Sequence, residues 1–121
     1  MPKHTFDHIH LMTPDPFKTA EFYEKMFGAK RTNDPDPNGE RVTVSLDLNG
    51  TIMLVSKAPE GAETGLVHFG IQSDDLDKSI EELKAAGVEF TMDKREIRPD
   101  FIISFLVAPD SVPIELQTGG I

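Results

Sequence analysis

The sequence has 121 residues, 38% of them hydrophobic and 27% charged, which is the size and composition of one ordinary globular domain. Its formal charge of −9, from 12 basic and 21 acidic residues, argues against nucleic acid or an anionic membrane surface as a partner. There is no cysteine and no apolar run of the ~20 residues that a membrane span needs, so disulfides, thiolate chemistry and a transmembrane helix are not expected. The first residues lack the apolar segment of a secretory signal, and we therefore expect a cytoplasmic protein.

The chain opens with the pattern of a strand followed by a helix. Residues 5–12 alternate between the two faces of a predicted strand. Asp15 then offers an N-cap side chain, and Pro16 suits the first helical position, where its missing N–H is not needed. Apolar residues keep helical spacing up to Phe27, and Gly28 suits the left-handed position that ends a helix.

A β-hairpin is predicted next. Residues 29–40 have the composition of a loop or a ragged edge strand. Residues 41–48 alternate clearly, and residues 51–56 form the return strand. Between them stands Asn49-Gly50, the pair most typical of a two-residue hairpin turn, because both positions tolerate positive φ.

The second half of the chain repeats this order. A strand over residues 65–72 is followed by capping residues at 73–75 and a helix that closes at Gly87. Three more strands are predicted at 88–92, 101–107 and 112–117.

The two halves therefore read as one strand–helix–strand–strand–strand unit used twice within a single domain over residues 1–121. Repeat 1 spans about residues 5–57 and repeat 2 about residues 65–118. We predict an α+β fold in which two βαβββ modules form a curved mixed sheet around a central cup, with the helices on its outer face. The alternative is a ferredoxin-like sheet whose pattern matches a repeat by coincidence.

Three side chains stand out as candidate metal ligands. His8 and His68 hold the same place in the leading strands of the two repeats, and Glu115 lies between apolar neighbours in the last strand. A lone strand histidine more often serves packing, but a repeated pair beside a buried carboxylate would leave costly polar groups without a cation. Two histidines and one carboxylate leave coordination positions open for substrate, and they suit divalent Fe, Mn, Co, Ni or Zn.

Several sequence segments, taken together, carry a resemblance to a known family. They are Phe6-Asp7-His8-Ile9, Phe22-Tyr23-Glu24-Lys25-Met26-Phe27-Gly28, Val67-His68-Phe69-Gly70-Ile71, Leu83-Lys84-Ala85-Ala86-Gly87-Val88, and Ala108-Pro109-Asp110-Ser111-Val112-Pro113-Ile114-Glu115-Leu116. The chain resembles the vicinal oxygen chelate superfamily of glyoxalases, methylmalonyl-CoA epimerases, extradiol dioxygenases, and fosfomycin and bleomycin resistance proteins. The resemblance implies paired βαβββ modules around a metal-binding cup, with the ligands falling on His8, His68 and Glu115.

One position departs from the pattern of that family. Glyoxalases and epimerases usually have a fourth ligand, Glu or Gln, on the strand where this chain has Met53, and methionine is a poor ligand for a hard ion. Met53 is therefore expected to line the substrate pocket. The remaining three-ligand set slightly favours a dioxygenase over a glyoxalase (lactoylglutathione lyase) or an epimerase.

The other candidate site residues follow from strand parity. His10 shares a face with His8 and is a candidate acid or base, although packing is an equal alternative. Gln72 is a second candidate catalytic residue, because it shares the parity of His68 and could hydrogen-bond substrate oxygens or neighbouring groups. The expected wall of the substrate pocket consists of Met53, Phe101, Ile103, Phe105 and Gln117, with ordinary core packing of its apolar members as the alternative.

The sequence thus predicts a small divalent-metal enzyme that acts on a small organic substrate chelating the metal through adjacent oxygens. The alternative is a non-catalytic protein that binds an antibiotic or metabolite on the same fold. Because many small members of the family dimerise, we expect a homodimer, with the site either inside one chain or shared between subunits.

Overall fold

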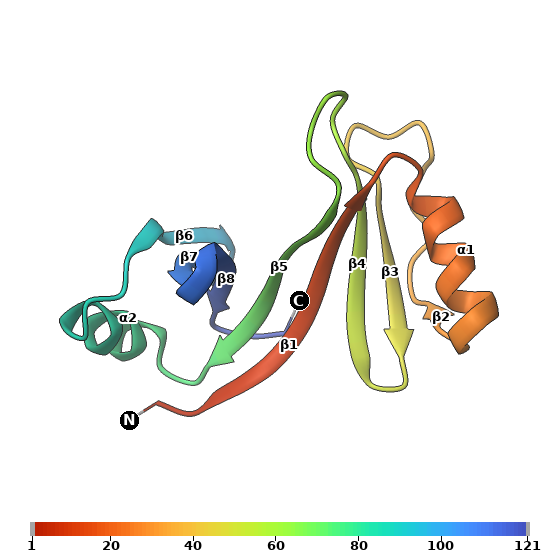
Figure 1. Ribbon diagram of the computed structural model, residues 1–121. Coiled ribbons are helices and arrows are strands. Elements are labelled where there is room, and N and C mark those ends of the chain that lie inside the picture. The colour runs from red at the N-terminus through yellow and green to blue at the C-terminus, as the bar shows by residue number, and fades with distance from the viewer. Residues whose placement is uncertain (1, 121) are drawn as a thin grey trace. The chain divides into compact units, whose positions relative to one another are not determined.

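The computed structural model describes residues 2–120 and shows the order strand–helix–strand–strand–strand twice (Figure 1). The first set comprises β1 (His4–Thr13), α1 (Pro16–Phe27), β2 (Lys30–Arg31), β3 (Thr43–Leu48) and β4 (Thr51–Lys57). The second comprises β5 (Gly65–Ser73), α2 (Leu76–Ala85), β6 (Phe90–Arg98), β7 (Phe101–Ala108) and β8 (Val112–Gln117), with a 3-10 turn over Pro109–Ser111 before β8. The predicted α+β fold of two βαβββ modules is therefore confirmed.

The backbone contacts divide the chain slightly differently from the sequence repeats. One compact unit, called the first unit here, is His8–Val67. The other, called the second unit, contains the described residues up to Asp7 together with those from His68 onward. The Lys3 amide donates to Asp74 Oδ1 at 2.8 Å, which ties the start of the chain to the end of β5. The first half of β1 thus belongs with the second repeat.

The first unit contains a four-stranded sheet in the order β2-β3-β4-β1. β1 is parallel to β4, and β4 is antiparallel to β3. The β3–β4 hairpin turns at Asn49 and Gly50, whose φ angles are 51° and 103°, and the Gly50 amide donates to Asp47 Oδ1 at 2.7 Å. The predicted hairpin is therefore present. The core, to which α1 contributes Ala20, consists of Ala20, Ala29, Val44, Leu46, Met53 and Val55.

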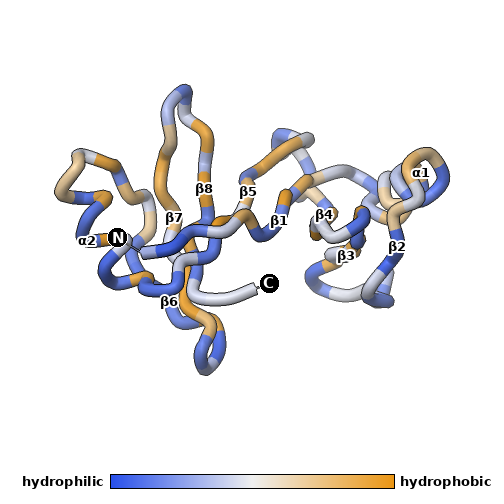
Figure 2. Tube along the Cα trace, turned by 90° about the horizontal axis from the view of Figure 1, so that it is seen from below, coloured by the Kyte–Doolittle hydropathy of each residue, from blue (hydrophilic) through white to orange (hydrophobic). Residues whose placement is uncertain are grey.

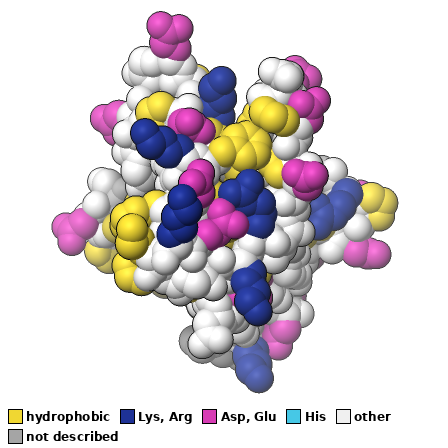
Figure 3. All heavy atoms as spheres, turned by 90° about the vertical axis from the view of Figure 1, so that its right-hand side faces the viewer, with side chains coloured by type: hydrophobic (Ala, Val, Ile, Leu, Met, Phe, Trp, Pro, Cys, Tyr) yellow, Lys and Arg dark blue, Asp and Glu magenta, His cyan; other side chains and the backbone are white. Residues whose placement is uncertain are grey.

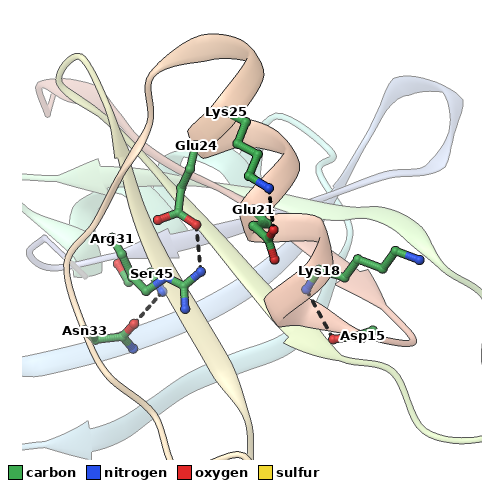
Figure 4. Close-up of polar contacts among 8 residues, drawn as sticks. All are labelled: Asp15, Lys18, Glu21, Glu24, Lys25, Arg31, Asn33 and Ser45. Atoms are coloured by element: carbon green, nitrogen blue, oxygen red, sulfur yellow. Dashed lines mark hydrogen bonds and ion pairs between the residues drawn. The ribbon is translucent and has the colours of Figure 1, made fainter.

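Helix α1 begins and ends where its sequence signals place it. Asp15 Oδ1 accepts a hydrogen bond from the Lys18 amide at 3.2 Å, and Pro16 occupies the first helical position (Figure 4). At the other end Gly28 has a φ of 74°, the left-handed conformation that glycine adopts without steric cost. Both ends are thus determined by local chemistry.

Replacing Asp15 with alanine removes the N-cap and is expected to lower the free energy of unfolding by about 1 kcal/mol. Urea denaturation followed by circular dichroism measures this change. Asp34→Ala, at an exposed loop position, is the matched control and should leave the urea midpoint unchanged. Equal effects of the two substitutions would contradict the capping role of Asp15.

Two ion pairs lie along α1 (Figure 4). Lys25 Nζ is 2.7 Å from Glu21 Oε1 one turn earlier, and both side chains are more than half exposed. Arg31 Nη2 is 2.7 Å from Glu24 Oε1, and these side chains are only 29% exposed. The second pair links the helix to β2, whereas the first contributes little because solvent screens it.

The second unit holds the other four strands in the order β5-β8-β7-β6. β5 is parallel to β8, while β8–β7 and β7–β6 are antiparallel. Asp75 caps α2, with its Oδ1 accepting from the Lys78 amide at 3.2 Å. The core of this unit, to which α2 contributes two residues, consists of Leu76, Ile80, Leu106, Ile114 and Leu116.

Strand β6 is longer than the sequence pattern predicts. The alternation of apolar residues stops at Met92, but the strand continues to Arg98. All of the added residues are exposed and all but Ile97 are charged, and in Figure 2 hydrophilic colour predominates in β6 and hydrophobic colour in β7. β6 ends the strand order of its unit and pairs with β7 through an irregular register, so backbone hydrogen bonds rather than apolar burial extend it.

The surface on the side of α1 mixes charges of both signs (Figure 3). Lysine and arginine side chains stand among aspartates and glutamates on this face, with hydrophobic side chains between them. Phe22, Met26 and Phe27 of α1 are each more than half exposed. Neither α1 nor α2 has the length and apolar character that a membrane-spanning helix requires.

Candidate metal centre

The second unit brings two of the predicted ligands together. His68 lies in β5 and Glu115 lies in β8. Glu115 pairs in register with Gly70, two positions after His68, so the side chains of His68 and Glu115 share a face. Their ligand atoms lie within 4.8 Å of one another. His68 is 7% exposed and Glu115 is 6% exposed. An imidazole and a carboxylate are thus held close together in a buried position.

An apolar wall stands beside this pair. Phe105 pairs in register with Glu115, and its ring meets the His68 ring edge-on with centroids 5.2 Å apart. Ile103 and Phe101 continue along the same face of β7 and are buried. The structure therefore places all three predicted β7 wall residues on the face of the candidate ligands. Their contact with a substrate stays a prediction.

Gln72 and Gln117 are also on this face, and both contact Asp7. Gln72 Nε2 donates to Asp7 Oδ1 at 2.7 Å, and Gln117 Nε2 donates to Asp7 Oδ2 at 3.2 Å. Asp7 is not among the predicted site residues, because alternation puts it on the opposite face from His8. The only sequence signal was its place directly before that histidine.

In the first unit, His8 is fully buried in β1, and His10 lies two residues further on. His10 Nε2 is 2.7 Å from Ser56 Oγ, which is 2.8 Å from Thr43 Oγ1. Burial lowers the pKa of His10 below its usual value, and the neighbouring His8 lowers it further. The lowered pKa favours the neutral imidazole, and the hydroxyl pair of Ser56 and Thr43 orients its ring. Its acid–base role stays a prediction.

Met53 does not lie where the sequence argument placed it. It is 6% exposed and packs in the core of the first unit with Ala20, Val44 and Leu46. Ala20 belongs to α1, so Met53 is on the face of the sheet that this helix covers. The expectation that Met53 lines the substrate pocket is corrected, because an alternating strand shows successive side chains to opposite faces.

Strand register identifies the residue that takes the place expected for Met53. The residue after His8 pairs with Met53 in β4. The residue after His68 pairs with the residue just before Glu115 in β8. Leu54, one position later than Met53, is therefore the counterpart of Glu115 in the first repeat. The first repeat offers an apolar side chain where the second offers a carboxylate.

Comparison with known proteins identifies the family. The profile of the Glyoxalase/Bleomycin resistance protein/Dioxygenase superfamily matches residues 5–116, which is most of the chain. The chain belongs to this superfamily. The resemblance found in the sequence is thereby confirmed, although a comparison with curated proteins gave no match.

Several solved structures share the fold. A hypothetical protein from Bacillus halodurans C-125 superposes with a TM-score of 0.78 at 17% identity, covering 98% of this chain and 96% of that one. Methylmalonyl-CoA epimerase from Mycobacterium tuberculosis gives 0.74 at 16% identity, covering 96% and 88%. A halotolerant catechol dioxygenase gives 0.69 at 18% identity, covering 96% of this chain but 40% of that one. At these identities the superpositions establish the fold and leave the reaction open.

Proposed function

We propose that this member of the superfamily is a divalent-metal enzyme in which His8, His68 and Glu115 hold the metal. Together the three residues offer two imidazole nitrogens and one carboxylate oxygen, a donor set that suits Fe, Mn, Co, Ni or Zn. All three side chains are buried. The observation that carries the proposal is the buried imidazole–carboxylate pair of the second unit, because such a pair fits a cation of double charge.

The protein residues would prepare the site for a substrate with two adjacent oxygens. A divalent cation supplies Lewis acidity toward such oxygens when it is bound. Phe105 limits rotation of the His68 ring through its edge-on contact. Together with Ile103 and Phe101 it offers an apolar surface that excludes water and suits an apolar or aromatic substrate body.

Within this proposal we favour ring cleavage of an aromatic diol over isomerisation. The glyoxalases that this chain resembles use a second carboxylate as the base for isomerisation, whereas here Leu54 occupies the position in the first repeat that corresponds to Glu115. Asp47, on the same face of the first unit, is engaged in the hairpin turn through the Gly50 amide. His10 is then the candidate acid–base group of the first unit. One of the similar structures is a catechol dioxygenase and another is an epimerase, so both reactions are worth assaying.

The experiment begins with metal analysis of the purified, dialysed protein. We expect about one divalent ion per chain. The protein loaded with Fe²⁺ is then given catechol in air, with oxygen uptake as the measurement, and the protein loaded with Co²⁺ is given methylmalonyl-CoA in deuterated water, with deuterium incorporation as the measurement. Oxygen uptake supports ring cleavage, and deuterium incorporation supports isomerisation. Absence of bound metal would overturn the proposal and leave small-molecule binding as the function of the fold.

A further inference from the structure

A hydrogen-bonded cluster of Asp7, Gln72 and Gln117 touches each of the three strands that carry a candidate ligand. Asp7 directly precedes His8 in β1. Gln72 follows His68 by four residues in β5, and Gln117 follows Glu115 by two in β8. The cluster is thus built from one residue on each ligand-bearing strand. We name it the Asp7 cluster.

The carboxylate of Asp7 joins the cluster by accepting from both amides. Its Oδ1 receives the Gln72 Nε2–H at 2.7 Å, and its Oδ2 receives a Gln117 Nε2–H at 3.2 Å. Hydrogen bonds to an ionised acceptor are stronger than bonds between neutral groups. Oδ1 is therefore bonded to a side chain of β5 and Oδ2 to a side chain of β8, so Asp7 links both strands to β1.

Gln117 is the most constrained member of the cluster. Its side chain is fully buried, and its Nε2 also donates to the Gly119 carbonyl oxygen at 2.5 Å. Both partners are acceptors, which fixes the amide orientation. Within residues 2–120 the amide oxygen is buried without a hydrogen-bond partner. The two N–H bonds together fix the position of the Gln117 amide, at the cost of a buried oxygen that has no partner.

We propose that Asp7, Gln72 and Gln117 are positioning residues that hold the backbone beside the metal ligands. This inference rests on the proposed function. It gives Gln117 a role other than contact with substrate oxygens, because both its N–H groups are used by Asp7 and Gly119. Metal sites require their ligands to be held within about 0.5 Å of the productive geometry, and side-chain bonds one to four residues away along each strand would provide this restraint.

The test is a charge-swap cycle. Asp7→Asn puts an amide against an amide, and Gln117→Glu puts two carboxylates together. In the double variant Asp7→Asn/Gln117→Glu, the new amide can donate to the new carboxylate, which restores the bond between positions 7 and 117 but not the bond to the Gly119 carbonyl oxygen. Asp77→Asn is the matched control, because it makes the same chemical change at an exposed carboxylate that pairs with Lys94 at 2.5 Å in the same unit.

The first measurement is the dissociation constant for Co²⁺, by competition with a chromophoric chelator. We expect each single variant to bind about 10-fold more weakly, the double variant to lose clearly less affinity than the sum of the two single losses, and Asp77→Asn to match the unaltered protein. Single variants that bind Co²⁺ normally, or a double variant whose loss is the sum of the single losses, would overturn the role of the Asp7 cluster.

The second measurement uses metal-free protein and separates this inference from the proposed function. Nitrogen-15 NMR signals of the His68 ring should shift in each single variant and return part of the way in the double variant, which restores only the bond between positions 7 and 117. If the unaltered protein does not bind Co²⁺, the proposed function is overturned. If the His68 signals have the same chemical shifts in all the variants as in the unaltered protein, the positioning role is overturned. If Asp7→Asn fails to fold, Gln72→Leu removes one of the two bonds and should give the same direction of change.

Discussion

Glu115→Gln is expected to abolish the stabilisation that a divalent metal gives to this protein. A metal present at about 100 times its dissociation constant should stabilise the unaltered chain by about 2.7 kcal/mol. For a domain of this size that corresponds to a rise in Tm of roughly 10 °C. Glutamine keeps the size of the side chain but replaces the anionic ligand with a neutral one that binds a divalent ion much more weakly, so the ion should not be held at this concentration. The rise should therefore disappear.

Thermal melts followed by circular dichroism measure this effect, with Mn²⁺, Co²⁺, Ni²⁺ and Zn²⁺ in turn. The control is Glu60→Gln, which neutralises an exposed carboxylate in the segment before β5 and should keep the full rise. A metal-dependent rise that survives Glu115→Gln would show that the ion binds elsewhere. A rise lost in both variants would point to a general effect of negative charge.

The elements of this fold were predictable where the deciding interactions are local. Asp15 and Gly28 define the ends of α1 through bonds and angles within one helical turn. Asn49 and Gly50 define the hairpin because they adopt positive φ at little cost. The repeated order of elements follows from such signals alone, and the family match over residues 5–116 agrees with it.

The prediction was less accurate where pairing between distant strands decides the outcome. Which of two adjacent residues in β4 shares a face with His8 depends on a parallel pairing with β1, and a shift of one residue exchanges the faces. The sequence spacing therefore indicates Met53 as the counterpart of Glu115, whereas the strand register assigns Leu54. The contacts of Asp7 were not foreseen for the same reason, since its partners Gln72 and Gln117 are far away in the chain.

Met53→Ala tests this correction through stability. Met53 is 6% exposed in the core of the first unit, so truncation should leave a cavity and lower the free energy of unfolding by about 2–5 kcal/mol. Leu54→Ala removes a half-buried side chain on the opposite face and should cost only about 1 kcal/mol. Urea denaturation of the metal-free proteins gives both values. The difference between the two neighbours measures which face is core.

Two further comparisons make the Met53 result specific. Met53→Leu conserves side-chain volume and should cost less than about 1.5 kcal/mol, which separates loss of packing from loss of sulfur. In the variants that remain folded, the metal-dependent rise in Tm should persist for Met53→Ala, because the side chain faces away from His8. If Met53→Ala instead left stability unchanged and weakened substrate or metal binding, Met53 would belong to the pocket and the register argument for Leu54 would fail. A large loss of stability at Met53 with binding retained places the apolar counterpart of Glu115 at Leu54.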